Sequence, residues 1–230
     1  MRKQILPYKV KMKIAFLGDS ITLGYGLEDK SVRYSTLVSD KLGLEEENYG
    51  ITGTLVAKAA YNKKGKKGED LDFVSRLELI READVAVVFG GTNDYFWSDE
   101  SMRGDVYDVK YFCDAIDTIC RFLVNERKGK ANLLVTPYAH NGIGNYLGGE
   151  NASFSNRHDT DQKNYNGYVL RDYVKVIAET AEHYGVPCLD LHKDIGFDWR
   201  IHTMDGCHPN EDGHAVLAKI ISKALIPLLK

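Results

Sequence analysis

Apolar runs and amphipathic stretches alternate along the whole chain. The clearest apolar run covers residues 84–89 and contains Val-Ala-Val-Val-Phe. A near-continuous apolar run of this length is typical of a strand that is covered on both faces. Four further short runs have a similar character, although the one at residues 46–49 is weak. The pattern therefore predicts five strands, at residues 13–17, 46–49, 84–89, 131–136 and 187–191.

The stretches between these runs repeat apolar residues with the spacing of a helix. In residues 105–125, Val109, Phe112 and Ile116 fall on one stripe. In residues 31–42 the helical spacing stops at Gly43, a residue type that commonly ends helices. The pattern predicts helices at residues 31–42, 71–80, 105–125, 161–184 and 211–229.

Strands that alternate with helices predict βαβ units, and therefore a parallel sheet in a layered α/β fold. No internal repeat or linker composition divides the chain, so we expect one domain over residues 1–230. Within it, residues 1–11 form an N-terminal extension, and residues 138–160 form a long loop rich in Gly, Asn and His. In an open sheet of this kind, ligands bind beyond the carboxyl ends of the strands.

Composition narrows the class of protein. The 230 residues are 43% hydrophobic, which is enough for a buried core, and a net charge of −3 argues against a nucleic-acid partner. We expect the Lys-rich insertion at residues 61–69 to be a solvated loop near the rim of the ligand cleft. No apolar run reaches the roughly 7–15 residues of a secretory signal or the about 20 of a membrane span. We therefore expect a cytoplasmic protein without stable membrane insertion.

Small polar motifs follow the first three predicted strands. Residues 18–20 (Gly-Asp-Ser) follow the first strand, residues 50–53 the second and residues 90–94 (Gly-Gly-Thr-Asn-Asp) the third. A fourth motif, residues 205–208 (Asp-Gly-Cys-His), lies on a short loop near the end of the chain. Each motif alone is typical of a turn or a helix cap. Because the first three lie at the carboxyl ends of parallel strands, we expect them to gather at the same end of the sheet.

These motifs supply the parts of an activated nucleophile. A serine hydroxyl needs a neighbouring base to take its proton, and His208 can serve Ser20 in this way. Asp205, three residues before the histidine, can orient the imidazole and stabilise its charge. Because Thr22 stands where the second glycine of G-x-S-x-G belongs, the ordinary α/β-hydrolase interpretation loses support. Cys207 is an alternative nucleophile, but as a sequence neighbour of His208 its side chain points in a different direction.

Acyl transfer also needs hydrogen-bond donors directed at the oxygen that becomes negative in the transition state. The backbone N–H of Gly53 can serve, because the chain turns tightly after the second strand. The side-chain amide of Asn93, after the third strand, is a second suitable donor. Nucleophile, base, carboxylate and oxyanion donors together indicate an esterase-type hydrolase.

As a set, the motifs resemble those of the SGNH subgroup of the GDSL-type esterases and lipases, in the right order along the chain. They are Gly18-Asp19-Ser20-Ile21-Thr22, Asn48-x-Gly50-x-x-Gly53, Gly90-x-Thr92-Asn93-Asp94 and Asp205-x-x-His208-Pro209. The resemblance implies Ser20 as the nucleophile, His208 as the general base and Asp205 as its partner. It also implies an oxyanion hole formed by the N–H groups of Ser20 and Gly53 and by the Asn93 side chain. The implied fold is a flavodoxin-like three-layer αβα sandwich, and no metal or organic cofactor is implied.

The substrate class is less closely defined by the sequence. The loop at residues 138–160 is polar and aromatic, which favours a carbohydrate or a small polar ester over a fatty-acyl tunnel. Tyr95, Phe96 and Trp97 follow the third motif and can stack on a sugar face or an acyl chain. The candidate substrate contacts are Asp19, Thr92, Tyr95 and His140.

We therefore expect a serine hydrolase that cleaves short-chain acyl esters, such as acetylated sugars, through an acyl-enzyme. A lysophospholipase or a thioesterase of the same family remains open. From a different class, a non-catalytic flavodoxin-like domain could bind a flavin phosphate at the loop after the first strand. That alternative leaves Asn93 and the Asp205–His208 pair unexplained. The oligomeric state stays open.

Overall fold

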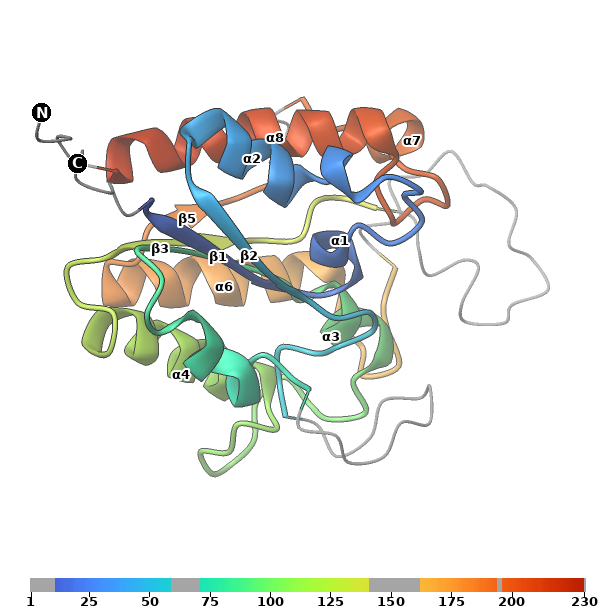
Figure 1. Ribbon diagram of the computed structural model, residues 1–230. Coiled ribbons are helices and arrows are strands. Elements are labelled where there is room, and N and C mark those ends of the chain that lie inside the picture. Colours follow the sequence, from blue (N-terminus) through green and yellow to red (C-terminus); the bar gives the residue numbers. More distant parts are fainter. Residues whose placement is uncertain (1–10, 59–70, 141–161, 194–195, 230) are drawn as a thin grey trace, which may run out of the picture.

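The computed structural model describes residues 11–58, 71–140, 162–193 and 196–229. At its centre is a sheet of five parallel strands in the order β2-β1-β3-β4-β5 (Figure 1). The strands are β1 (Lys13–Gly18), β2 (Glu45–Gly50), β3 (Val85–Phe89), β4 (Ala131–Val135) and β5 (Cys188–Leu189). All five strands that the apolar runs predict are therefore present, although β5 is only two residues long.

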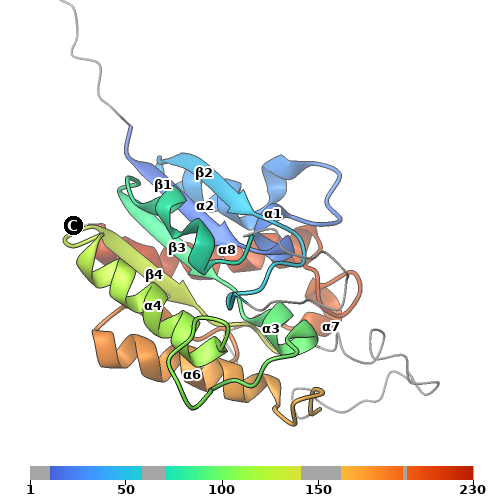
Figure 2. The same cartoon turned by 90° about the horizontal axis from the view of Figure 1, so that it is seen from below.

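Two layers of helices cover the sheet, as Figures 1 and 2 show. On one face lie α2 (Tyr34–Leu42) and α8 (Glu211–Leu225), and on the other lie α4 (Phe112–Asn125) and α6 (Leu170–Tyr184). The strand order 2-1-3-4-5 is that of a flavodoxin-like doubly wound sheet. The predicted three-layer αβα sandwich with a five-stranded parallel sheet is confirmed.

The side chains of β1 alternate between two hydrophobic cores because successive residues of a strand point to opposite faces. Ile14 and Phe16 belong to the core under α2 and α8, whereas Ala15 and Leu17 belong to the core under α4 and α6. Strand β3 is buried along its whole length, as its continuous apolar run predicts. Strand β2 lies at the edge of the sheet, which is why its three glutamates are compatible with a strand.

The long helix predicted at residues 105–125 starts later than expected, at the first residue of α4. The segment before it folds back onto the helix. The Asp114 carboxylate accepts the N–H of Asp108 at 2.8 Å, and the Tyr107 hydroxyl lies 2.7 Å from the Thr118 hydroxyl. Because these contacts hold the segment in turns, it cannot add a further turn to the helix.

Other predicted helices are shorter for local reasons. The stretch at residues 31–42 is divided by the extended backbone of Arg33, so that η1 (Lys30–Val32) precedes α2. The helix predicted from residue 161 begins only at the first residue of α6, because Gly167 takes a left-handed turn with φ 83°. Two stretches differ in type or length: residues 71–80 contain the 3₁₀ helix η2 (Val74–Ile80), and residues 211–229 contain α8 followed by η4 (Ile226–Leu228).

Short helices carry the predicted motifs to one end of the sheet. Helix α1 (Ser20–Leu23) directly follows β1, α3 (Thr92–Trp97) follows β3, and α7 (Trp199–His202) precedes the last motif. The chain passes from β1 to β2 on one side and then returns to β3 on the other side of β1. Ligands bind at such a reversal of strand order in open α/β sheets, so this end of the sheet is where a site is expected.

Three features of the sequence fall outside the described residues. They are the Lys-rich insertion at residues 61–69, residues 1–10 of the N-terminal extension and residues 141–160 of the long loop. Among the helices that are described, none is both long enough and apolar enough to cross a membrane.

Candidate active site

Ser20 is the first residue of α1, directly after β1. The helix starts here because the Asp19 carboxylate accepts the N–H of Ile21 at 2.9 Å and so caps it. As the first helical residue, Ser20 has a backbone N–H that no carbonyl of its own helix can accept. The Asn48 side chain donates to the Thr22 carbonyl at 2.8 Å, which ties α1 to β2. Ser20 is therefore held on a short, well-anchored element.

The Asp205 carboxylate organises the loop that carries His208. Its Oδ1 accepts the N–H of Cys207 at 3.0 Å and that of His208 at 2.7 Å, while its Oδ2 lies 2.7 Å from His208 Nδ1. A separation of three residues lets one carboxylate bind both the backbone and the ring. The turn between them passes through Gly206, whose φ of 86° favours glycine.

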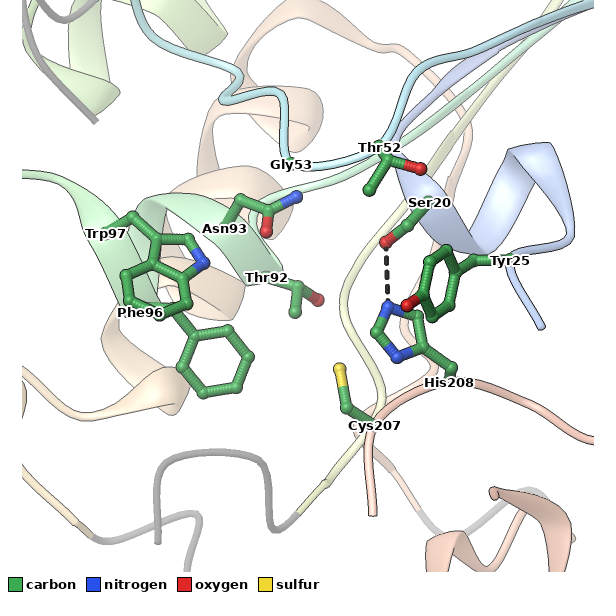
Figure 3. Close-up of a pocket in the computed structure, with 10 residues that line it drawn as sticks. All are labelled: Ser20, Tyr25, Thr52, Gly53, Thr92, Asn93, Phe96, Trp97, Cys207 and His208. Atoms are coloured by element: carbon green, nitrogen blue, oxygen red, sulfur yellow. Dashed lines mark hydrogen bonds between the residues drawn. The ribbon is translucent and has the colours of Figure 1, made fainter. Parts of the chain in front are cut away.

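The ring of His208 faces Ser20 (Figure 3). His208 Nε2 lies 3.0 Å from Ser20 Oγ, within the roughly 2.6–3.2 Å expected between a general base and the oxygen whose proton it takes. Asp205, His208 and Ser20 thus form a continuous chain of hydrogen bonds. The ring of Tyr25 packs against the imidazole with 4.6 Å between the ring centroids, which restricts the plane of the imidazole.

The Asp205 carboxylate, which binds the His208 ring nitrogen that faces away from Ser20, is stabilised in its charged form. Burial acts against ionisation of Asp205, but hydrogen bonds from the ring and the backbone of His208 outweigh it and lower the pKa to about 2. Asp205 is thus ionised at neutral pH and can stabilise an imidazolium. Asp19 differs, because burial raises the pKa of its carboxyl to about 6 against the opposing effect of the Ile21 N–H.

Gly53 and Asn93 line the same pocket as Ser20 (Figure 3). Gly53 lies in the loop after β2 with φ 77°, a conformation that other residues rarely adopt. Asn93 lies in the first turn of α3. Its Nδ2 donates to the carbonyl of Thr54 at 3.0 Å and lies 3.4 Å from Asp19 Oδ2. The predicted nucleophile, base, carboxylate and two donors are therefore brought together.

The pocket beside Ser20 is small, with a volume of about 90 Å³. Figure 3 shows Phe96 and Trp97, both from α3, across the pocket from Ser20 and His208. The Sγ atom of Cys207 points into the space between these two sides. One end of the pocket is thus polar, whereas the opposite side is aromatic.

The four candidate substrate contacts are placed differently. Thr92 lines the pocket. Asp19, Tyr95 and His140 are buried side chains outside the pocket lining that the structure describes. Asp19 caps α1, and the Tyr95 hydroxyl donates to the carbonyl of Gln162 at 2.6 Å. A role of the four residues in substrate binding stays a prediction.

Two pocket residues have no counterpart among the predicted site residues, namely Tyr25 and Thr52. Thr52 lies inside the second motif, so the motif itself was a signal for it. Tyr25 stands between two glycines, which indicates a turn but says nothing about which way the ring points. Only the folded chain shows that this ring lies against His208.

Side chains that bind metals do not gather at this pocket. Over the described ranges of the chain, no three His, Cys, Asp or Glu side chains form a set that could hold a metal ion. The polar side-chain groups that line the pocket are hydroxyls, an amide, an imidazole, an indole N–H and a thiol. Such groups donate, accept and transfer protons, which suits acyl transfer.

The fold and this pocket define a three-layer α/β protein with a serine, a histidine and a carboxylate aligned at the carboxyl end of its sheet. The chain belongs to the GDSL-like lipase/acylhydrolase family, whose model matches residues 16–216. That match includes all four motifs.

Similar proteins agree with this assignment. An acetylxylan esterase from Xylanibacter ruminicola is 24% identical over 221 residues, which cover 95% of this chain and 44% of that protein. The chain thus spans less than half the length of this relative. A protein of known crystal structure from Lactobacillus plantarum is 26% identical, with coverage of 96% and 99% and a TM-score of 0.74. The crystal structure of an acetyl xylan esterase shares the fold at 23% identity, with coverage of 94% and 100% and a TM-score of 0.62.

Proposed function

We propose that the protein is a serine hydrolase that cleaves carboxylic esters through an acyl-enzyme. The observation that carries this proposal is the chain of hydrogen bonds in the pocket. Ser20 Oγ lies 3.0 Å from His208 Nε2, and His208 Nδ1 lies 2.7 Å from Asp205 Oδ2. Nucleophile, base and orienting carboxylate in this arrangement activate a serine. Membership of a lipase/acylhydrolase family supports the same chemistry.

In the proposed reaction, Ser20 Oγ attacks the ester carbonyl carbon while its proton passes to His208 Nε2. The ionised Asp205 stabilises the imidazolium that results. The imidazolium then gives the proton to the leaving alcohol, and the acyl group stays on Ser20. Water, activated by His208 in the same way, releases the acid and restores the serine.

The carbonyl oxygen becomes negative during the attack and needs hydrogen-bond donors. We assign this role to the N–H groups of Ser20 and Gly53 and to Asn93 Nδ2. An amide nitrogen carries two hydrogens. One hydrogen of Asn93 Nδ2 is engaged by the Thr54 carbonyl at 3.0 Å, while the contact with Asp19 at 3.4 Å is long. Among the described residues, the second hydrogen makes only this long contact in the ground state and is therefore available to the oxyanion.

The size of the pocket favours a short acyl chain. Its volume of about 90 Å³ is far below the roughly 300–1,000 Å³ of pockets that enclose drug-sized ligands. Phe96 and Trp97 form a wall across from Ser20, so a long acyl chain of a lysophospholipid would meet aromatic rings. We therefore propose short-chain esters as substrates, with acetylated sugars first. The name of the acetylxylan esterase relative supports the sugar part.

Replacing the nucleophile tests this function. Ser20→Ala should lower kcat on p-nitrophenyl acetate by at least about 10⁴-fold and abolish labelling by a fluorophosphonate probe, because it removes the hydroxyl that His208 activates. Ser101→Ala, which changes an exposed serine far along the chain, should keep both properties. Wild-type protein that resists the probe and cleaves no short-chain ester would contradict the proposal. A yellow protein with flavin absorbance would favour the binding-domain alternative instead.

The substrate class needs a panel of esters. Acetate release from acetylated xylo-oligosaccharides, compared with hydrolysis of p-nitrophenyl acetate and hexanoate, separates the sugar part from the acyl part. A preference for hexanoate would point to a lipase or thioesterase of the same family. A preference for acetate on a sugar supports the proposed substrate.

A further inference from the structure

We propose that Asp94 is a positioning residue that fixes the loop at residues 51–57, which contains Gly53, relative to Ser20. Helix α3 would then both carry the Asn93 donor and position the Gly53 donor. This inference rests on the proposed function. Asp94 follows Asn93 in the first turn of α3 and is 1% exposed. Its Oδ2 accepts the N–H of Val56 at 2.9 Å, and its Oδ1 accepts the N–H of Ala57 at 3.0 Å. Both carboxylate oxygens thus bind the loop that follows Gly53.

The part of the loop nearer to Gly53 is held by two other side chains. Asn93 Nδ2 donates to the Thr54 carbonyl at 3.0 Å, and Arg76 donates to the Thr54 hydroxyl at 3.1 Å. Arg76 is 5% exposed and also donates to the carbonyl of Gly18 at 3.2 Å, at the end of β1. The loop is therefore fastened to α3 and to the strand that carries the nucleophile.

These side-chain contacts matter because the sheet does not reach the loop. The described ladder between β1 and β2 ends at the pair Gly18–Gly50, and one further bond joins the Ile51 N–H to the Gly18 carbonyl at 3.2 Å. Residues 51–57 form turns and bends without a helix or a strand. Within the loop, the N–H and the hydroxyl of Thr54 donate to the Ile51 carbonyl at 3.4 and 2.9 Å and close the turn at Gly53. The position of this turn relative to Ser20 depends on bonds from other elements.

Position is critical for an oxyanion donor. Such a donor acts when it lies about 2.7–3.1 Å from the oxygen as that oxygen becomes negative. A displacement of about 1 Å can lower the rate by about 10²-fold. Because the donor of Gly53 is a backbone N–H, only replacement by proline removes it, and proline cannot adopt the φ of 77° found here. The bonds from Asp94 offer a way to displace it.

Burial makes the charged form of the Asp94 carboxylate unfavourable. Burial raises the pKa of Asp94 to about 7, although the N–H groups of Ala57 and Val56 act in the opposite direction. Asparagine has nearly the same shape but has one acceptor oxygen for two N–H donors. Its amide NH₂ would face a backbone N–H. Asp94→Asn should therefore loosen the loop and leave the side-chain volume unchanged.

The test compares Asp94→Asn with Asp114→Asn as a matched control. Asp114 also accepts a backbone N–H, that of Asp108 at 2.8 Å, but it orders a segment that does not line the pocket. We expect Asp94→Asn to lower kcat on p-nitrophenyl acetate by about 10–100-fold with KM within about 2-fold, since only the transition state carries the oxyanion. Asp114→Asn should leave kcat within about 2-fold.

A transition-state analogue separates positioning from general damage. Trifluoroacetone adds to an activated serine and places a negative oxygen at the oxyanion position, so its affinity should fall by the same factor as kcat/KM in Asp94→Asn. Thr54→Val keeps the shape but removes the hydroxyl that accepts from Arg76 and donates to the Ile51 carbonyl, and it should shift both values in the same direction by a smaller factor. It provides the test if Asp94→Asn does not fold.

Two outcomes overturn the inference. One is an Asp94→Asn protein with the kcat of the Asp114→Asn control. The other is a loss that falls on KM while the affinity for trifluoroacetone is unchanged. Wild-type protein that is inactive, or a Ser20→Ala variant that stays active, would instead overturn the proposed function. The two failures are therefore distinguishable.

Discussion

Replacing Asn93 by alanine should lower the catalytic rate far more than it lowers the stability of this protein. The variant removes the proposed side-chain donor of the oxyanion. In the folded ground state it removes one hydrogen bond of 3.0 Å to the Thr54 carbonyl and one long contact of 3.4 Å to Asp19. A neutral hydrogen bond contributes about 1 kcal/mol to folding, so the free energy of unfolding should fall by about 1–2 kcal/mol.

The effect on the reaction should be larger. Loss of one oxyanion donor raises the barrier by about 3–4 kcal/mol, which corresponds to a fall in kcat of about 10²–10³-fold. KM should change little, because the uncharged carbonyl of the bound ester gains little from this donor. The measurements are steady-state kinetics with p-nitrophenyl acetate and urea unfolding followed by circular dichroism.

Asn164→Ala is a matched control, because the two asparagines are almost equally buried, with 8% exposed for Asn164 and 7% for Asn93. The Asn164 amide makes more bonds: it donates to the Tyr95 carbonyl at 3.1 Å and to the Tyr173 hydroxyl at 2.9 Å, and its oxygen accepts two backbone N–H groups at 3.0 Å. It does not line the pocket described beside Ser20. Asn164→Ala should therefore lower stability by about 2–4 kcal/mol with kcat within about 3-fold.

The reasoning is refuted if the two variants behave alike. A fall in kcat below about 10-fold for Asn93→Ala would show that this amide is not an oxyanion donor. A rise in KM at constant kcat would assign it to ground-state binding instead.

Two further predictions concern the pocket wall and the core. Trp97→Ala should raise the ratio of kcat/KM for hexanoate over acetate by about 10-fold or more, because the ring lies across the pocket from Ser20, and an unchanged ratio contradicts this wall. His214 is fully buried, and burial lowers its pKa to about 4. Between pH 6.5 and 4 the unfolded chain binds a proton at His214 that the folded chain does not, so the contribution of His214 alone should lower wild-type stability by up to about 3 kcal/mol over this window. His214→Gln should lose this dependence in urea unfolding at pH 7 and pH 4, while equal pH slopes for both proteins would contradict the assignment.

The strands were predictable because their signal is local, although it was weak for β2. Strand β3 is a continuous apolar run, and in the structure every one of its residues is buried. The fold class followed from the alternation of strands with helical stretches. The boundaries of helices were less predictable, since the start of α4 depends on Asp114 and Tyr107 folding the preceding segment back onto the helix.

The parts of the site were predictable as residue types but not as contacts. Asp94 is visible in the third motif, yet nothing in the motif shows that its carboxylate binds Val56 and Ala57, which lie 38 and 37 positions away. Arg76 falls in an amphipathic stretch, where a charged residue is normally assigned to the solvent face. The structure buries it, because carbonyls at the ends of two strands accept its N–H groups.

The sequence by itself determined the layered parallel fold and the internal geometry of the Asp205–His208 loop. A carboxylate three residues before a histidine can reach both the backbone and the ring through local bonds. Only the tertiary structure decided that His208 meets Ser20, 188 positions earlier in the chain. The physical reason is that the parallel sheet brings the carboxyl ends of β1, β2 and β3 together. Short turns and buried side-chain bonds there fix distances that no sequence spacing encodes.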